Sequence, residues 1–154
     1  MKPTVTPLWP RFRCPRPVLH DVKTRFRSSS GALVVLGLAL LALLTRLPLR
    51  TTALYSWDAV LYARALEHFD VRVEQPHPPG YVGYVALAKL LQALVGESNT
   101  ALVMVSVLGA TVAVAMTVVL GRRLFGSGVG VAAGAILVTS PAFWFYSGVA
   151  YPYT

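Results

Sequence analysis

Hydrophobic positions divide the chain into three long apolar segments, which are separated by a mixed segment and by a short basic one. The apolar segments cover residues 31–47, 100–120 and 129–146, and the second of them has no charged residue. An α-helix rises about 1.5 Å per residue and the hydrocarbon core of a bilayer is about 30 Å thick, so roughly 20 apolar residues cross it. The pattern therefore predicts an all-α integral membrane protein with three transmembrane helices over these ranges.

The mixed segment, residues 48–98, contains two stretches with helical periodicity. In residues 57–69 the apolar side chains recur on one side, and Ser56 is placed to cap the helix N-terminus. Residues 80–95 are short for a span, because they would rise only about 24 Å, and Lys89 would lie at their centre. We expect two interfacial amphipathic helices within one loop.

Between these two helices, prolines surround a histidine in the stretch Gln75–Tyr81. Proline fixes φ and restrains the residue before it, so residues 76–79 are expected to be stiff and extended rather than helical. A stiff loop holds the His77 ring at a low entropic cost, which suits a group that meets a ligand. The same prolines also fit a rigid turn that only opens the next helix. Asp58, in the first turn of the preceding helix, either meets a ligand or only complements the helix dipole.

The composition favours a membrane protein and concentrates positive charge near the N-terminus. Hydrophobic residues make up 55% of the chain and charged residues 13%, about half the charged share of a soluble domain. The net charge is +8, and residues 1–30 hold seven of the fourteen Lys and Arg. No recognition helix, zinc spacing or aromatic RNA motif accompanies this charge, which argues against a nucleic-acid partner. We expect residues 1–30 to be a disordered basic cytoplasmic arm, and the lone Cys14 has no partner for a disulfide or a metal site.

The first apolar segment, residues 31–47, has the charged start and hydrophobic middle of a signal peptide. No cleavage site of small residues follows it, so we expect an uncleaved span with its N-terminus inside. Arg46, near the end of this segment, is expected to extend to the far interface.

The other basic residues orient the remaining spans. With three spans, Arg122 and Arg123, in an expected tight loop over residues 121–126, share the cytoplasmic side with the basic arm. This satisfies the positive-inside rule, whereas a fourth span over residues 80–95 would place both arginines outside. Residues 58–77 and the C-terminus are therefore expected on the outer face of a bacterial-type plasma membrane.

The order of these features resembles a known family. Arg46-Leu47-Pro48 ends the first span, Asp58 follows, His77-Pro78-Pro79-Gly80 opens the second amphipathic helix, and the later spans end in residues 121–126 and in Ser140-Pro141. From about residue 31 onward, this set resembles the N-terminal part of the membrane glycosyltransferases of the GT-C fold. Within them it is most similar to glycosyltransferase family 39, which includes protein O-mannosyltransferases and lipid A aminoarabinose transferases.

The resemblance implies transfer of a sugar from a polyprenyl-phosphate donor to an acceptor on the outer membrane face. An acid in the first outer loop of such enzymes acts as general base or helps to hold a divalent metal ion, which implies Asp58, with Mg²⁺ or Mn²⁺ as the metal. A Lys or His before Pro-Pro contacts the donor phosphate, which implies His77. Arg64, Arg72 and Lys89 are further candidates for phosphate contacts, on charge alone.

The chain departs from this family in two ways. Ala59 follows Asp58, where many O-mannosyltransferases have a second acid, and family members run to several hundred residues with more spans. We therefore expect an N-terminal portion, whose missing spans belong to a longer product or to a partner chain. The alternative is a small non-enzymatic membrane protein that binds a lipid phosphate or a partner protein, with Gly130 and Gly134 as a small-residue packing surface.

Overall fold

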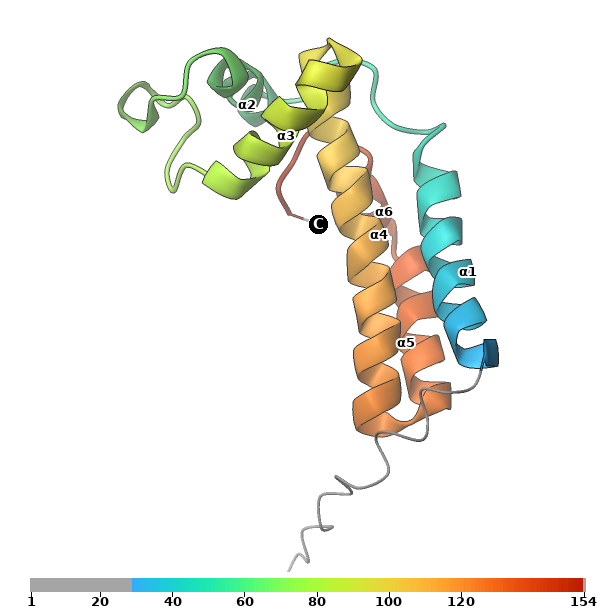
Figure 1. The fold of residues 1–154 in the computed structure, drawn as a ribbon. Helices are drawn as coiled ribbons and strands as arrows, with labels where there is room; N and C mark the ends of the chain where they lie inside the picture. Colours follow the sequence, from blue (N-terminus) through green and yellow to red (C-terminus); the bar gives the residue numbers. More distant parts are fainter. Residues whose placement is uncertain (1–28, 154) are drawn as a thin grey trace, which may run out of the picture.

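The computed structural model describes residues 29–153, and this part of the chain is all-α, as predicted (Figure 1). The elements are α1 (Ser29–Arg46), α2 (Trp57–Glu67), the 3₁₀ turn η2 (Val71–Val73), α3 (Val82–Val95), α4 (Ser98–Phe125), α5 (Ser127–Thr139) and α6 (Pro141–Ser147). Within the described residues the β-type pairing is limited to an isolated bridge between Asp70 and Gln75. Residues 1–28 of the predicted arm, with Cys14, lie outside the described residues.

The long helix α4 is the axis of the fold. α1 and α5 pack along it, while α2 and α3 project from its N-terminal end (Figure 1). From here on, "the arm" means α2 and α3 with the loop between them, and not the basic segment of residues 1–30. At one end of the bundle, the Arg122 guanidinium donates to the carbonyl of Gly31. At the other end, the Asn99 side-chain amide donates to the carbonyl of Thr51 at 3.1 Å. α1 and α4 are therefore antiparallel, and the arm lies at the end opposite Arg122.

One helix within residues 29–153, α4, is by itself long and apolar enough to cross a membrane. α5 and α6 meet the same criterion only as a pair, and they are bent by 63° at the break between them. α1 and α3 are apolar but shorter. The structure thus gives one clear candidate span, and the three-span architecture stays a prediction.

The single helix predicted over residues 129–146 is broken in the structure. Ser140 is extended, and Pro141 is the first residue of α6. Proline cannot donate the backbone hydrogen bond that a continuous helix needs, but it fits the first position of a new one. The chain therefore changes direction at this point.

The tight loop predicted over residues 121–126 is also wrong, because α4 continues to Phe125. Gly126 ends the helix, with φ at 101°. Gly121 lies within α4, at the point where α4 packs closely against α5. A Cβ atom at this position would lie 2.7 Å from the Cα of Gly130. The glycine that suggested a loop is instead a point of close helix packing.

The glycines of α5 face α4. A Cβ atom on Gly130 would lie 2.4 Å from the backbone nitrogen of Arg122, and one on Gly134 would lie 2.2 Å from a methyl carbon of Val118. The small-residue packing surface predicted at Gly130 and Gly134 is therefore used between α4 and α5 of this chain.

Arg46 does not extend to an interface, contrary to the prediction, since its side chain is only 1% exposed. Its Nε donates to Ser147 Oγ at 2.8 Å, and its Nη2 donates to the Val138 carbonyl at 3.1 Å. The Phe143 ring centroid lies 5.5 Å from the guanidinium carbon. A buried cation is costly unless it is hydrogen-bonded, and the break between α5 and α6 supplies these acceptors.

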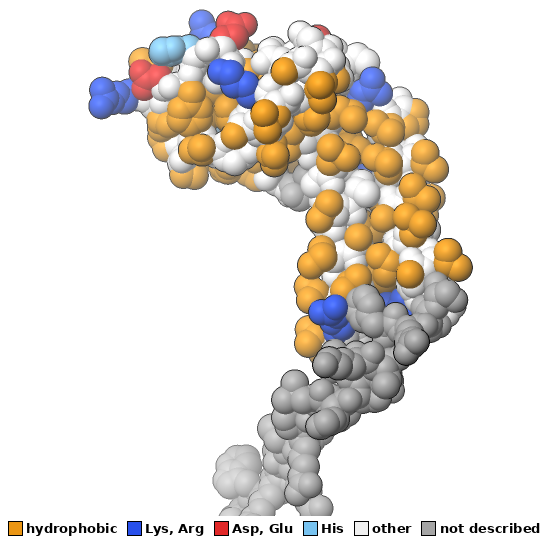
Figure 2. Space-filling view, in the orientation of Figure 1, with side chains coloured by type: hydrophobic (Ala, Val, Ile, Leu, Met, Phe, Trp, Pro, Cys, Tyr) orange, Lys and Arg blue, Asp and Glu red, His pale blue; other side chains and the backbone are white. Residues whose placement is uncertain are grey.

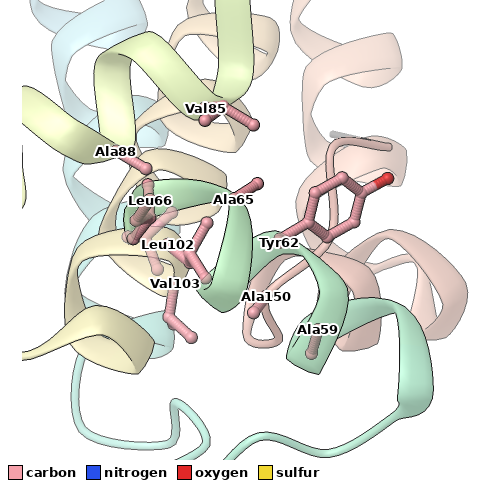
Figure 3. Packing of buried hydrophobic residues seen from close by; sticks show 10 residues of the cluster. Ala59, Tyr62, Ala65, Leu66, Val85, Ala88, Leu102, Val103 and Ala150 are labelled. Carbon is pink, nitrogen blue, oxygen red and sulfur yellow. The ribbon is translucent and has the colours of Figure 1, made fainter. Parts of the chain in front are cut away.

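An aliphatic cluster fixes the arm to α4 (Figure 3). Its buried members come from α2, α3, α4 and the segment after α6, and they are Ala59, Tyr62, Ala65, Leu66, Val85, Ala88, Leu102, Val103, Val107 and Ala150. Ser56 Oγ accepts from the Ala59 N–H at 3.2 Å, which confirms the predicted N-cap of α2. The helices predicted over residues 57–69 and 80–95 are thus present, each slightly shorter.

The surface of the arm is amphipathic. Figure 2 shows charged and histidine side chains gathered along its outer edge, while hydrophobic side chains cover the side from which the bundle extends. On α3, Leu87, Leu90 and Leu94 recur at helical spacing and are exposed. This arrangement fits a helix that lies in a membrane interface.

Candidate functional site

The proline stretch forms a turn rather than an extended segment. The Gly80 N–H donates to the His77 carbonyl at 3.0 Å, and Gly80 has φ at 92°, a conformation that favours glycine. Pro76 is fully buried, while His77 is half-buried. The stretch is non-helical, as predicted, but the expected straight run is wrong because this turn closes it. It opens α3 and at the same time points the His77 ring at α2.

His77 lies within a group of tyrosines. Its ring centroid is 5.5 Å from that of Tyr62, on α2, and 5.5 Å from that of Tyr81, which precedes α3. Tyr81 also lies edge-on to Tyr62 at 5.7 Å and to Tyr153 at 6.3 Å. We call Tyr62, His77, Tyr81 and Tyr153 the tyrosine–histidine cluster. It joins the arm to the last described residues of the chain.

Two polar atoms of this cluster are buried without a hydrogen-bond partner: the hydroxyl of Tyr62 and Nδ1 of His77. Tyr62 is 0% exposed, and Figure 3 shows its ring reaching away from the aliphatic side chains with the hydroxyl at the far end. A neighbouring tyrosine behaves differently, because the Tyr84 hydroxyl donates to the Leu102 carbonyl at 3.0 Å. Burial, with smaller effects of Tyr153, Tyr81 and Asp58, raises the pKa of Tyr62, so its hydroxyl stays protonated.

Asp58 belongs to the same neighbourhood. It lies one helical turn before Tyr62, in the first turn of α2 as predicted, so the two side chains share a face of the helix. It is half-buried and close enough to raise the pKa of Tyr153, after the larger effects of the Tyr81 hydrogen bond and of burial. Within the described residues, no hydrogen bond or ion pair engages the Asp58 carboxylate.

The three cations predicted as phosphate contacts lie outside the cluster. Arg64 follows Asp58 by six residues on α2, which is about 120° further around the helix. Arg72 lies on η2 and Lys89 on α3, and all three side chains are exposed. Asp58 and His77 thus each lie near Tyr62, whereas these cations lie on the arm's surface.

The predicted Mg²⁺ or Mn²⁺ site at Asp58 is not accompanied by a cluster of metal ligands in the described residues. Across the described part of the chain, no three His, Cys, Asp or Glu side chains gather in one place. Asp58 is the single residue that we predicted as a metal ligand, and Mg²⁺ and Mn²⁺ sites usually combine several oxygen ligands. The role of Asp58 toward a metal stays a prediction.

Sequence reasoning missed the tyrosines. Tyr62 was assigned only to the apolar face of its helix, and Tyr81 and Tyr153 were given no role. Spacing to Asp58 could have marked Tyr62, because residues four apart share a helix face. Tyr153 could not be found in this way, since its place depends on how the chain returns after α6. Comparison with family models, with curated proteins and with solved structures finds no match.

Proposed function

We propose that this chain carries the outer-loop site of a membrane glycosyltransferase, which moves a sugar from a polyprenyl-phosphate donor to an acceptor hydroxyl. The observation that carries the proposal is that Asp58 and His77 both lie near Tyr62, although they are nineteen positions apart in the sequence. A carboxylate without a hydrogen-bond or ion-pair partner among the described residues, and an imidazole next to the same tyrosine, are groups that such a transfer can use.

The outer surface of the bundle supports a membrane setting. Leu108, Val112, Met116 and Leu120 recur every four residues on α4, and all are exposed. The polar side chains Thr111 and Thr117 instead donate to carbonyls of their own helix, at 2.9 and 2.8 Å. An apolar outer stripe with internally bonded hydroxyls suits contact with lipid.

We extend this setting to three spans: α1, α4 and the bent pair α5–α6. The arm and the cluster would then lie on the outer face, and Arg122 and Arg123 on the cytoplasmic side. The apolar side of α3 would rest in the outer interface. A lipid-linked donor would approach the cluster from the same surface.

In the proposed reaction, the Asp58 carboxylate takes the proton of the acceptor hydroxyl. The hydroxyl oxygen forms a bond to C1 of the sugar, and the bond between C1 and the phosphate oxygen breaks with its electron pair, which releases polyprenyl phosphate. His77 donates a hydrogen bond to the phosphate as charge develops on it. Arg64, Arg72 and Lys89 are candidates to attract the lipid phosphate to the arm.

The test uses membranes that contain the tagged chain, together with polyprenyl phosphates bearing radiolabelled mannose, glucose or aminoarabinose. We expect label transfer from at least one donor, and a decrease of at least about a hundredfold in Asp58→Asn, because a positioned base contributes that much to such reactions. Asp70→Asn is the matched control, since Asp70 only caps η2, by accepting from the Arg72 N–H at 2.9 Å. Immunoblots should show equal membrane levels of all three proteins.

Normal transfer by Asp58→Asn would remove the catalytic role from Asp58. Binding of the donors by the unmodified chain, without transfer from any of them, would instead favour the non-enzymatic protein that binds a lipid phosphate.

A further inference from the structure

We infer that the tyrosine–histidine cluster is the subsite for the neutral, hydroxyl-rich ring of the sugar, with Tyr62 as its central residue. This inference rests on the proposed function and assigns the ligand chemistry of that site. In this arrangement Nδ1 of His77 forms a hydrogen bond with a sugar hydroxyl, and Nε2 of the same ring forms one with the donor phosphate.

The first argument is the pair of unpartnered polar atoms. The Tyr62 hydroxyl and His77 Nδ1 are both buried and unbonded, although their rings are neighbours at 5.5 Å. Native proteins leave few buried polar groups unbonded, because each such group loses its hydrogen bond to water without replacement. Two of them at one place indicate a ligand that both donates and accepts hydrogen bonds, as sugar hydroxyls do.

The second argument is the shape and charge of the surroundings. Tyr81 stands edge-on to both Tyr62 and Tyr153, so the cluster is built of aromatic rings, on which the apolar face of a sugar ring can pack. Among the described residues, the formal charge that acts on Tyr62 is the carboxylate of Asp58, while Arg64 and Lys89 are exposed elsewhere on the arm. A neutral ring suits this environment better than a phosphate does.

Tyr153 is the side chain that gives access to the site. It is the neighbour with the largest electrostatic effect on Tyr62, and it is 53% exposed. In this proposal the ligand enters past Tyr153, which lies outside α2, α3 and α4, so a displacement of its ring would leave those helices in place.

The test is saturation-transfer difference NMR on the full chain in nanodiscs, with free mannose, glucose, galactose or arabinose as probes, and with glycerol and inorganic phosphate as reference probes. We expect a signal from the ring protons of at least one sugar. It should fall about two- to tenfold in Tyr62→Phe, the value of one neutral hydrogen bond. Tyr84→Phe is the matched control and should keep the signal, because the Tyr84 hydroxyl is bonded to α4.

Thermal unfolding of the same variants separates a ligand role from a structural one. Tyr62→Phe should unfold at the same temperature as the unmodified chain or higher, because it removes an unbonded buried hydroxyl. Tyr84→Phe should unfold at a lower temperature, because it removes a bonded one. A lower unfolding temperature for Tyr62→Phe would show that its hydroxyl serves the fold, and would overturn the inference.

The binding outcomes are equally decisive. The inference is wrong if no sugar gives a signal, if the signal is unchanged in Tyr62→Phe, or if phosphate or glycerol alone gives the signal that depends on Tyr62. Failure of the proposed function looks different: sugar binding would depend on Tyr62, while no donor would give label transfer.

Discussion

At the scale of single residues, Arg46 shows how a charge can be placed in the interior of an apolar bundle. Its guanidinium donates hydrogen bonds to Ser147, Val138, Thr45 and Ala42. The Val138 carbonyl and the Ser147 hydroxyl come from either side of the break between α5 and α6. The guanidinium therefore joins the end of α1 to both helices of the bent pair.

We expect Arg46→Lys to lower the stability of the fold by about 2–4 kcal/mol. The planar guanidinium of arginine reaches acceptors on both helices at once, and the single ammonium group of lysine cannot. The measurement is the thermal unfolding midpoint of the purified chain in detergent. Arg50→Lys is the matched control, since Arg50 makes a single bond, to the Leu47 carbonyl. Similar midpoints for both variants would contradict the role assigned to Arg46.

Some residue roles followed from local sequence and others did not. Ser56 and Asp58 were predictable, because a cap and a first-turn acid depend only on neighbouring residues. The burial of Arg46 was not, because two of its acceptors, Val138 and Ser147, lie 92 and 101 residues further along the chain. The same holds for the unbonded hydroxyl of Tyr62, whose environment is completed by His77, Tyr81 and Tyr153.

At the scale of helices, the close packing of α4 on α5 depends on glycine. We expect Gly130→Ala to lower the stability by about 1–3 kcal/mol, because the new methyl would meet the backbone of Arg122 and Val118, which cannot rotate away. Gly128→Ala is the control, since nothing lies within 4 Å of a Cβ atom there, and alanine favours the helix. The measurement is the thermal unfolding midpoint of Gly130→Ala and of Gly128→Ala in detergent. Equal midpoints for the two variants would contradict close packing at Gly130.

Hydrophobic periodicity predicted where the helices are, but not where they stop. The segments of α1, α2, α3 and α4 were each found within a few residues. The errors lie at glycine and proline: Gly121 suggested a loop but allows two helices to touch, and Pro141 was taken inside a span but begins α6. The meaning of either residue depends on the neighbouring helix, which a single segment of sequence does not contain.

At the scale of the whole molecule, the fold places the arm and the Arg122 end at opposite ends of α4. We expect single cysteines at these ends, in a Cys14→Ser background, to be labelled from opposite sides of the membrane. Val73→Cys, at a position 55% exposed, should react with a membrane-impermeant maleimide in intact cells, and Leu124→Cys, at a position 70% exposed, only after permeabilisation. The opposite order would invert the proposed topology, and labelling of both in intact cells would contradict a span between them.

The return of the chain after α6 has a consequence for the order of assembly. Ala150 completes the aliphatic cluster under the arm, and Ser106 Oγ donates to the Tyr151 carbonyl at 2.7 Å across 45 residues. The ribosome makes the arm well before these residues, so α2 and α3 are on the nascent chain while this part of their packing is still missing. Contacts between distant parts of a sequence form late, because a long loop must first close. The site therefore matures only after α5 and α6 are in position, and a nascent chain still lacking them holds the acid and the histidine in an unfinished arm.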